Sequence, residues 1–385
     1  FRQSEVFLPG GRSFANLAKM SAMGIPTIAV VHGNSTAGGA YTPGLSDQVI
    51  VVKNRSKIFL AGPPLLKAAL GEIATDEELG GAEMHYTVSG LAEYIADDDA
   101  EAIKKCREVV KNLGWNDGFT STKNEDFSEP IYSPNELIGV VPTDYKKPYD
   151  VREVIARIVD GSEYLDFKPE FGKQTVTGTA RIHGYKVGIV GNNGPIFADG
   201  AVKAAQFIQL CSKHNTPLIF LQNTTGYMVG TKEERRGIIK HGSKMIQAVT
   251  NCTVPKITLR IGASFGAGEY GMAGRSFDPR FLFSWPNNKL SVMGGEQAGR
   301  TMSQVAVESA KRRGEEPNME MIKAIEQKII DTYKEEGEAL FATARIWDDG
   351  IIDPRDTRKI LGECLNIVCD SEKRNLQPNT FGVGR

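Results

Sequence analysis

The sequence predicts an α/β protein built from two copies of one strand, loop and helix unit, related as an internal repeat. Two stretches of small residues carry this prediction: GNSTAGGAYTPG from Gly33 to Gly44, and GASFGAGEYGMAG from Gly262 to Gly274. Each follows a proline and a run rich in β-branched residues, IPTIAVVH and VPKITLRI respectively. A gap-free run of matches at one offset indicates a repeat rather than shared composition. The matched pairs, all 229 positions apart, are Ile25/Val254, Pro26/Pro255, Ile28/Ile257, Gly33/Gly262, Ser35/Ser264, Gly39/Gly268 and Tyr41/Tyr270.

Length and charge are those of an ordinary globular protein with room for two domains. The chain has 385 residues, and its 46 basic and 47 acidic residues leave a formal net charge of −1. This balance provides no field that would attract nucleic acid or a membrane surface. We see no signal peptide and no apolar run that approaches the roughly 18 residues of a membrane span, so we expect no membrane partner.

The five cysteines are scattered along the chain. Their odd number and irregular spacing favour buried thiols in a reducing compartment over disulfides, and CLNIVC near the end is not a zinc pattern. We therefore expect no metal in this chain.

Three segments are predicted. Residues 1–115 are expected to be the later part of a first domain, because the opening FRQSEVFLPGG contains no Met and has the pattern of the middle of a domain. Residues 116–148 carry four prolines and no strong periodicity, which predicts an interdomain linker. Residues 149–385 are expected to form the second domain.

The elements of the first domain follow from their patterns. GRSFANLAKMSAMG has apolar residues at helical spacing, and IPTIAVVHG and DQVIVVK are typical of buried strands. DDDAEAIKKCREVVKNLGW predicts a helix with acidic residues at its start and Gly114 near its end. The acidic triplet 97–99 is a metal candidate by composition, but its place before a helical run favours capping and solvation.

The second domain is predicted to begin with a helix, DVREVIARIVDGSEYLDF, and a hairpin, TVTGTARIHGYKVGIVGNNG, with His183 and Gly184 in the turn. Helix AVKAAQFIQLCSKHN, strand TPLIFLQN, helical GTKEERRGIIKHGSKMIQAVTN and strand VPKITLRI follow. Strand FLFSWP then leads to the loop KLSVMGGEQ. SAKRRGEEPNMEMIKAIEQKIIDTYKEEG is predicted to be charged, helical and solvent-facing, where it can wrap a neighbour, and DDGIIDPRDTRKILGECL to be a turn into a final helix.

The two glycine loops suggest a common chemistry. A strand that ends in small residues lets a ligand atom approach the main chain closely. The free N–H groups at the start of the following helix then point at that atom and favour negative charge, as in an oxyanion hole. The candidate donors are the N–H groups of Gly38 and Gly39 in the first loop and of Ala267 and Gly268 in the second. A chain with two such loops can stabilise two oxyanions, one in each half.

Alternatives to an oxyanion hole have less support. Tight strand-to-helix packing accounts equally well for a single glycine loop, but the repetition favours function. A phosphate-binding P-loop is not predicted because no Gly-Lys-Ser/Thr follows. Side-chain catalysis is weakly indicated, since there is no HExxH and the five histidines are scattered. Glu269 lies within the second loop and is a candidate base, although a carboxylate near a helix start is the simpler interpretation.

Motifs throughout the chain resemble the carboxyltransferase (β) subunits of biotin-dependent acyl-CoA carboxylases, and most of all the methylcrotonyl-CoA and geranyl-CoA carboxylase branch. The resemblance covers almost all 385 residues. It rests on TAGGAY, FLAGPPL, LGGAEMH, FIQLC, PLIFLQNTTGYMVG, GASFGAGEYGMAGR, SVMGGEQ and DDGIIDPRDTR.

The resemblance implies two crotonase-like domains, each a β-β-α superhelix, which accounts for the repeat. It implies carboxyl transfer from carboxybiotin to an acyl-CoA, with 3-methylcrotonyl-CoA the first choice of acceptor. Gly38 and Gly39 would hold the thioester oxygen of the enolate, and Ala267 and Gly268 the ureido oxygen of biotin. Further contacts are implied for acyl-CoA with Ala15 and Ala37, and for biotin with Phe265 and Gly266. The biotin nitrogen would take the substrate proton, which agrees with the missing side-chain base.

Partners follow from the same resemblance. Biotin would be carried by an α subunit with biotin carboxylase and biotin carrier domains, and coenzyme A would enter as the thioester substrate. The chain would pair with itself in a β hexamer, giving an α6β6 complex, because each active site is shared between subunits. The compartment would be the bacterial cytoplasm or the mitochondrial matrix.

The acyl group stays open because the sequence departs from the methylcrotonyl pattern near its start. Family members usually have an aromatic pair before Asn-Gln, where this chain has Phe14-Ala15-Asn16-Leu17. Ala15 is expected to enlarge the acyl pocket, although a packing exchange in a helix accounts for it equally well. Geranyl-CoA, propionyl-CoA and long-chain acyl-CoA therefore remain alternatives, as does a biotin-dependent decarboxylase.

Two further hypotheses have less support. A crotonase-type hydratase would need a paired glutamate near the first loop, where Asp47 is the only acid. A purely structural subunit would tolerate bulky residues in the loops, and there are none.

Overall fold

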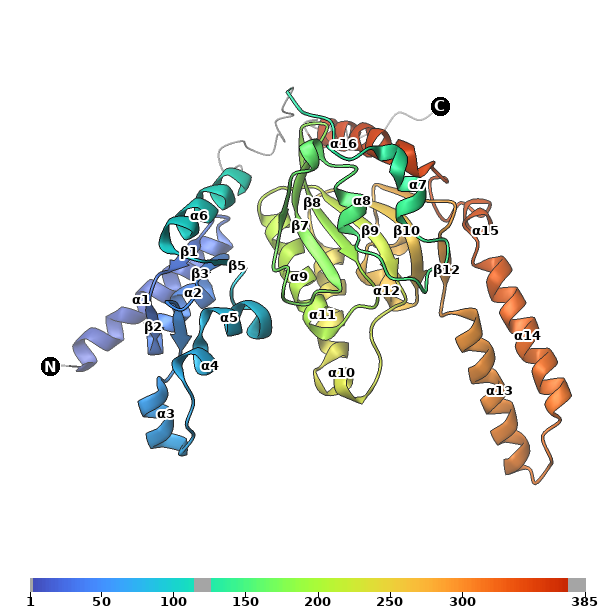
Figure 1. Ribbon diagram of the computed structural model, residues 1–385, viewed down its shortest axis with the longest axis horizontal. Coiled ribbons are helices and arrows are strands. Elements are labelled where there is room, and N and C mark those ends of the chain that lie inside the picture. Colours follow the sequence, from blue (N-terminus) through green and yellow to red (C-terminus); the bar gives the residue numbers. More distant parts are fainter. Residues whose placement is uncertain (1–2, 114–125, 373–385) are drawn as a thin grey trace, which may run out of the picture.

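The computed structural model describes residues 3–113 and 126–372 of the chain. The helix end predicted at Gly114 and the first part of the predicted linker lie outside these ranges. Two bodies are visible, an N-terminal region (residues 3–113) and a larger C-terminal domain (residues 126–372), with a helical hairpin projecting from the far side of the latter (Figure 1).

The N-terminal region is built around a small parallel sheet with the order β1-β3-β5. The strand β3 is buried along its whole length, as its run QVIVV predicts for a central strand. A second pair, β2 and β4, lies beside it. The strands are β1 (Ile28–Val31), β2 (Asn34–Thr36), β3 (Gln48–Val52), β4 (Lys57–Phe59) and β5 (Tyr94–Ala96). The α-helices are α1 (Gln3–Ala22), α2 (Tyr41–Leu45), α3 (Pro63–Leu70), α4 (Asp76–Gly80), α5 (Ala82–Met84) and α6 (Asp99–Leu113).

The C-terminal domain contains a seven-stranded mixed sheet with the order β11-β10-β9-β8-β7-β6, in which β12 also pairs with β10. Its strands are β6 (Tyr164–Asp166), β7 (Thr175–Ile182), β8 (Tyr185–Asn192), β9 (Leu218–Thr224), β10 (Lys256–Phe265), β11 (Phe281–Ser284) and β12 (Lys289–Ser291). Its α-helices are α7 (Leu137–Val140), α8 (Arg152–Ile155), α9 (Ala198–Lys213), α10 (Thr231–Arg235), α11 (Ile238–Asn251), α12 (Ala267–Gly271), α13 (Gly295–Arg312), α14 (Met319–Glu336), α15 (Ala339–Thr343) and α16 (Thr357–Glu372).

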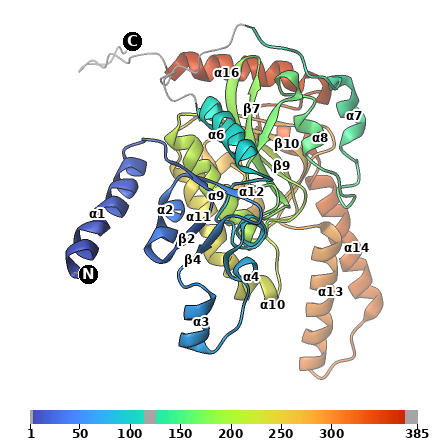
Figure 2. The same cartoon turned by 60° about the vertical axis from the view of Figure 1, so that its left-hand side comes forward.

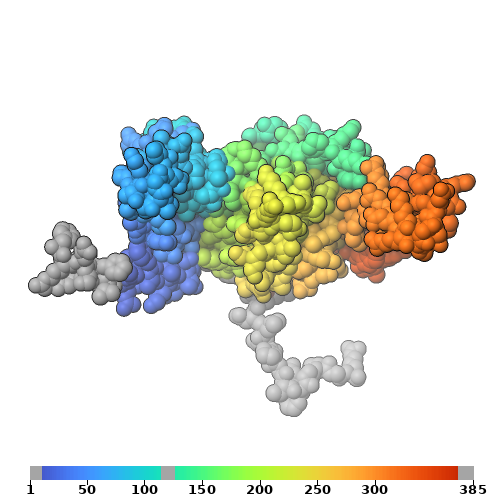
Figure 3. Space-filling view, turned by 90° about the horizontal axis from the view of Figure 1, so that it is seen from below, coloured from blue at the N-terminus to red at the C-terminus, as the bar shows by residue number. Residues whose placement is uncertain are grey.

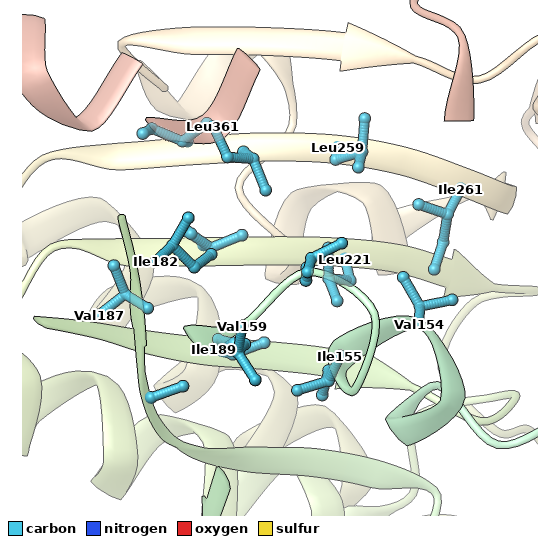
Figure 4. Close-up of a cluster of buried hydrophobic side chains, with 14 of the residues drawn as sticks. Val154, Ile155, Val159, Ile182, Val187, Ile189, Leu221, Leu259, Ile261 and Leu361 are labelled. Atoms are coloured by element: carbon cyan, nitrogen blue, oxygen red, sulfur yellow. The ribbon is translucent and has the colours of Figure 1, made fainter. Parts of the chain in front are cut away.

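Apolar side chains fill both faces of this sheet. On one face, residues of β7 to β10 pack against α8 and α16; Figure 4 shows Ile189, Leu221 and Leu259 among them. On the other face, α9 and α11 cover the strands with a second cluster. Burial on both faces explains why the sequences of these strands are continuous runs of apolar residues rather than alternating apolar and polar residues.

The strand pairing confirms the predicted repeat. Ile28 of β1 pairs in parallel with β3, and Ile257 of β10, its match 229 positions on, pairs in parallel with β11. Asn34 of β2 pairs in parallel with β4, and its match Ala263 pairs in parallel with β12. The same unit of strand, small-residue loop and two parallel partners is therefore present in each half.

Four element predictions need correction. The helix expected at the start of the second domain is one turn, α8, and the chain then enters β6. The helical stretch 230–251 is divided into α10 and α11 at Gly237, which has a φ of 76°. The loop predicted after β11 contains the short strand β12. The charged segment 309–337 is part of two helices, α13 and α14, because the Gly314 and Pro317 region breaks it.

The described part of the predicted linker lies against the C-terminal domain. Leu137 and Val141 are buried among the core residues of that domain. The hairpin of α13 and α14 projects at the end opposite to the N-terminal region, as the space-filling view shows in orange and blue (Figure 3). Its apolar side chains Met302 and Val305 are about half exposed, at 50% and 53%.

Buried ion pairs join the N-terminal region to the C-terminal domain. Lys213 at the end of α9 contacts Asp47 at 2.6 Å, and Lys168 contacts Glu93 at 3.1 Å. Gln206 of α9 also donates to Glu93, at 3.1 Å. The N-terminal region therefore docks on the face that carries α9, while α1 runs outward from the junction (Figures 1 and 2).

Candidate functional site

The first loop makes its sharp turn at a strained residue. β2 ends at Thr36, and Ala37 has a φ of 51°, in the left-handed region that residues other than glycine rarely adopt. The short 3-10 helix Ala37–Ala40 follows, so the N–H groups of Gly38 and Gly39 lie in a first turn, where a helix offers them no acceptor. Both glycines are exposed. The loop therefore carries two neighbouring backbone donors in an exposed first turn.

Packing requires neither of these two glycines. A Cβ added at Gly39 would lie 3.7 Å from Ser35 Oγ, an ordinary contact, and Ser35 Oγ itself donates to the Gly39 carbonyl at 2.8 Å. A Cβ at Gly38 would lie 3.6 Å from the ring of Phe14. Tight strand-to-helix packing therefore does not explain these two glycines.

The structure identifies Phe14 as a neighbour of the first loop. This side chain of α1 contacts the Tyr41 ring edge-on, with ring centroids 6.3 Å apart, and lies over Gly38. The residue predicted from the sequence was Ala15 instead. Ala15 is exposed on α1, next to Phe14 in the chain, and its part in an acyl pocket stays a prediction. The sequence does contain a signal for Phe14, because this residue lies in the run Phe14-Ala15-Asn16-Leu17, where the chain departs from the methylcrotonyl pattern.

The second loop also turns at a residue with a positive φ. Gly266, which matches Ala37 in the repeat, has a φ of 57° and precedes the five-residue helix α12. The N–H groups of Ala267 and Gly268 open that helix, again in a first turn. Ala267 is exposed, and Gly268 is buried behind it. In each half of the chain, a pair of first-turn N–H donors thus follows a residue with a positive φ.

Packing does constrain the glycines of the second loop. A Cβ at Gly268 would lie 2.9 Å from both Gly226 Cα and Thr224 Cγ2, and one at Gly271 would lie 2.3 Å from Tyr227 Oη. The segment after β9 therefore supports α12 from behind. In the sequence this segment, NTTGYMVG, stands out only as a family motif. No local pattern signals such a contact between positions so far apart in the chain.

Phe265, the last residue of β10, is buried between the second loop and two cavities. Its ring meets that of Tyr145 edge-on, with centroids 5.2 Å apart and an interplanar angle of 78°. Both side chains line a cavity of about 190 Å³ and a neighbouring one of about 330 Å³. Lys146 and Glu296, 2.7 Å apart, border the larger cavity. Tyr145 comes from the predicted linker and was not foreseen as a site residue.

Two familiar motif spacings occur in the second loop without the matching chemistry. GASFG, residues 262–266, has the spacing of a serine nucleophile elbow, but Ser264 is fully buried within β10 and donates to Gln222 at 2.8 Å. GAGEYG, residues 266–271, has the spacing of a dinucleotide fingerprint, but α12 ends after five residues. Neither arrangement exposes the groups that those chemistries need.

Glu269 is engaged in an ion pair. Its carboxylate accepts from Arg260 Nη2 at 2.8 Å and from the Arg275 N–H at 3.2 Å. The side chain is 12% exposed and that of Arg260 is 1% exposed. The carboxylate is thus tied to the protein, which supports a structural role over that of a free base.

Two of the histidines, His32 and His85, are held by structural contacts. His32 is 2.8 Å from Asp99, which lowers the pKa of that carboxyl, and His85 Nε2 is 2.6 Å from the Ile58 carbonyl. Burial lowers the pKa of His214 to about 4, so it is neutral at pH 7. The basic residues near the first loop pair with carboxylates as well: Lys53 with Asp97, Arg55 with Asp99 and Lys57 with Glu77.

None of the hydrogen bonds and ion pairs among residues 3–113 and 126–372 joins the first loop to the second. The first loop belongs to the N-terminal region and the second to the C-terminal domain (Figure 1). Within the described part of the chain, no group of three or more His, Cys, Asp or Glu residues is arranged to hold a metal. No described helix is long and apolar enough to cross a membrane.

Comparison with known proteins gives a consistent result. The carboxyl transferase domain family matches residues 2–382. A probable biotin-dependent acyl-coenzyme A carboxylase beta2 subunit of Mycobacterium tuberculosis is 52% identical over 384 residues, covering 100% of this chain and 72% of that protein. The mitochondrial methylcrotonoyl-CoA carboxylase beta chain of Arabidopsis thaliana is 48% identical over 392 residues, covering 100% of this chain and 66% of that protein. The chain thus spans about two thirds of the length of these relatives.

Solved structures agree. The beta subunit of geranyl-CoA carboxylase from P. aeruginosa is 54% identical with a TM-score of 0.64, covering 100% of this chain and 71% of that one. The transcarboxylase 12S subunit, crystallised as a hexamer with methylmalonyl-coenzyme A, is 33% identical with a TM-score of 0.81, covering 97% and 71% respectively. These proteins resemble the chain in both sequence and fold.

Proposed function

We propose, from the premise that the chain belongs to the carboxyl transferase domain family, that it transfers the carboxyl group of carboxybiotin to an acyl-CoA, with 3-methylcrotonyl-CoA as the acceptor. The family membership and the methylcrotonoyl-CoA carboxylase relatives, about half identical to this chain, support that class of reaction. The acceptor rests on the relatives alone.

One observation carries the mechanism: a residue with a positive φ precedes a pair of first-turn amides in each half of the chain, Ala37 in the first and Gly266 in the second. A carboxyl transfer of this kind creates negative charge on two oxygens, that of the thioester and that of the biotin ring. Two preformed holes match two oxyanions, and removing one donor from such a hole costs about 3–4 kcal/mol of transition-state stabilisation in comparable enzymes.

The first loop would receive the acyl-CoA. The turn at Ala37 orients the N–H groups of Gly38 and Gly39 before any substrate arrives. These donors therefore need little reorganisation when the thioester becomes an enolate. Absence of a Cβ at both positions leaves the approach to these donors open. Phe14 provides an apolar wall beside them.

The second loop would receive the biotin ring. When bound, carboxybiotin supplies CO2, and its ring nitrogen accepts the proton of the substrate. The residues present fit such a group, because Ala267 has only a small side chain beside its N–H, and Phe265 and Tyr145 provide apolar walls to the adjoining cavities. Ala267 and Gly268 would donate to the ring oxygen, which stabilises the biotin left after transfer.

The partner proposals follow from the relatives. A hexameric transcarboxylase core and a set of beta subunits among the relatives support a β hexamer joined to a biotin-carrying α subunit. An active site shared between copies is consistent with two loops that no hydrogen bond or ion pair connects among the described residues. Bacterial and mitochondrial relatives support the bacterial cytoplasm or the mitochondrial matrix as the compartment.

Geranyl-CoA is a second candidate acceptor. The 54% identity to a geranyl-CoA carboxylase beta subunit favours it, as does an alanine at position 15 beside Phe14. A longer acyl chain needs room close to the first loop, and Ala15 offers more room than a large side chain would.

The test is bicarbonate fixation by the complex purified from its native source, supplied with ATP and acetyl-, propionyl-, 3-methylcrotonyl-, geranyl- or long-chain acyl-CoA. An avidin-treated sample isolates the biotin-dependent part. We expect avidin-sensitive fixation with 3-methylcrotonyl-CoA as the preferred acceptor. A preference for geranyl-CoA would establish the second candidate instead, and no avidin-sensitive fixation with any acceptor would refute both.

A further inference from the structure

Helix α12 has too few residues to hold its own position. It spans five residues, whereas isolated helices shorter than about 12 residues are marginal in water. Its first two N–H groups are those of Ala267 and Gly268, so the direction in which they point depends on tertiary contacts. The question is which contacts fix α12 against the strand from which it emerges.

The strongest polar contact is the ion pair between Glu269, in the middle of α12, and Arg260, on β10. Their atoms Oε1 and Nη2 are 2.8 Å apart, and the Arg260 side chain is 1% exposed. The same carboxylate oxygen accepts from the Arg275 N–H at 3.2 Å. A single side chain of α12 therefore ties the helix to the strand before it and to the turn after it.

The surroundings are shaped for this carboxylate. A Cβ built at Gly274 would lie 1.9 Å from Glu269 Cδ and 2.0 Å from each of its oxygens. Only glycine at position 274 leaves the space that the carboxylate occupies. The Gly274 N–H also donates to the Glu269 carbonyl at 2.9 Å, which closes the turn around the helix end.

The first copy of the repeat does without this ion pair. The positions that match Arg260 and Glu269 are Val31 and Ala40, which pack together in an apolar cluster. The fold of the unit therefore does not require charged residues there. A buried ion pair is also seldom more stabilising than apolar residues of similar volume. Stability of the fold alone leaves the pair unexplained.

Electrostatics gives the pair a second effect. Glu269 is the third residue of α12, within a turn of the two N–H groups, and an uncompensated carboxylate there would oppose negative charge on a bound oxygen. Arg260 neutralises it. Arg260 Nε and Nη1 are buried and have no hydrogen-bond partner among the described residues. No other acceptor among these residues therefore competes with Glu269 for the guanidinium. The ion pair thus leaves the start of the helix without net negative charge from Glu269.

We propose that Arg260 and Glu269 are positioning residues of the second loop, which hold α12 in place and keep the hole at its start free of net negative charge. The inference rests on the proposed function for its kinetic consequence, but the positioning of α12 is measurable without it. Neither side chain needs to touch a substrate.

The test uses the purified complex with Arg260→Val, with Glu269→Ala and with both substitutions together. The double variant carries the valine and alanine that the first copy has at the matching positions, Val31 and Ala40. Arg260→Val leaves Glu269 uncompensated. We expect its kcat to fall at least 100-fold while the KM for the acyl-CoA changes less than twofold, because the first loop is untouched. The double variant should recover at least tenfold of that loss, since the carboxylate is gone as well.

A matched control separates positioning from stability. Arg358 and Asp160 form another buried pair, 2.7 Å apart, on α16 and before β6, away from the second loop. Asp160→Asn should lower the melting temperature and leave kcat within twofold. Hydrogen exchange provides a readout that needs no activity: Arg260→Val should raise exchange in a peptide covering residues 265–274 and leave one covering residues 34–45 unchanged.

The outcomes are distinct. An Arg260→Val complex with wild-type kcat, a double variant no better than the single one, or unchanged exchange at residues 265–274 would each overturn the proposal. A wild-type complex without avidin-sensitive fixation would refute the proposed function instead, and the exchange measurement would then decide the positioning of α12 by itself.

Discussion

The ammonium group of Lys168 lies 3.1 Å from the carboxylate of Glu93, and both side chains are almost fully buried where the N-terminal region meets the C-terminal domain. Gln206 and the backbone N–H of Val49 also donate to this carboxylate. Each partner of the ion pair comes from a different half of the chain. The contact therefore holds the region that carries the first loop against the domain that carries the second.

Removing one charge from this pair should destabilise the junction strongly. We expect Lys168→Met to lower the free energy of unfolding by about 3–5 kcal/mol, because it leaves Glu93 buried without its counter-charge. Denaturation in urea measures the change. The double variant Lys168→Met/Glu93→Met should recover most of the loss, and Arg313→Met, which breaks an exposed pair with Glu315, should change stability by less than about 1 kcal/mol. A single variant as stable as the wild type would contradict the assignment.

Lys203 should make stability depend on pH. Its ammonium group is fully buried and donates to the carbonyls of Lys168 and Phe171, and burial lowers its pKa to about 7 from the usual 10.5. Between these two pKa values the unfolded chain binds a proton that the folded protein releases. Stability should therefore rise with pH across this window, by at most about 1.4 kcal/mol per pH unit, and this group should add no pH dependence below about pH 7.

Urea unfolding of the wild type and Lys203→Gln at several pH values between about 6 and 9 tests this expectation. Glutamine still donates to the carbonyls but does not titrate. The stability difference between wild type and variant should change in favour of the wild type as the pH rises above 7. A difference that stays constant over the whole range would show that Lys203 keeps an ordinary pKa.

Substitution at Gly39 should affect catalysis and spare the fold. A Cβ at this position would make an ordinary 3.7 Å contact with Ser35 Oγ, so Gly39→Val is expected to fold and assemble. Its side chain would block the approach to the N–H groups of Gly38 and Gly39, and if these are the donors of the proposed oxyanion hole, carboxylation should fall at least 100-fold. Gly44→Val is the matched control, because a Cβ at Gly44 meets nothing within 4 Å. Equal rates for the two variants would remove the first loop from the site.

The residue at position 15 should set the preferred acyl length. Ala15 is exposed on α1 beside Phe14, which contacts the first loop. We expect Ala15→Phe to lower kcat/KM for geranyl-CoA at least tenfold more than for 3-methylcrotonyl-CoA, since pocket contacts of this size are worth about 1–3 kcal/mol. Steady-state rates with both acceptors measure the ratio. An unchanged ratio would assign Ala15 to helix packing alone.

The repeat in the sequence predicted the parts of the fold that depend on local pattern. Identical residues at one offset, such as Ile28 and Ile257, occupy equivalent strands with equivalent parallel partners. The small-residue loops follow these strands as expected. Local pattern was sufficient here because the strand, turn and helix signals of each copy are close together in the sequence.

The remainder of the site depends on contacts that no local pattern encodes. Tyr145 reaches Phe265 from a segment without periodicity, and Phe14 reaches Gly38 from another helix. Arg260 and Glu269 are nine positions apart, on a strand and a helix, so neither strand nor helix periodicity pairs them. The break between α13 and α14 was missed for a different reason, since charged residues continue across it.

The central claim is that the two loops serve one transfer reaction, and carboxyl transfer in the complete complex tests it most directly. Labelled bicarbonate and ATP first charge biotin on the partner subunit, and the acyl-CoA is then added to the wild type, to Gly39→Val and to Ala267→Phe. We predict that biotin is labelled in all three complexes and that the label moves to the acyl-CoA only in the wild type. Transfer at the wild-type rate in either variant would show that its loop is not part of the reaction.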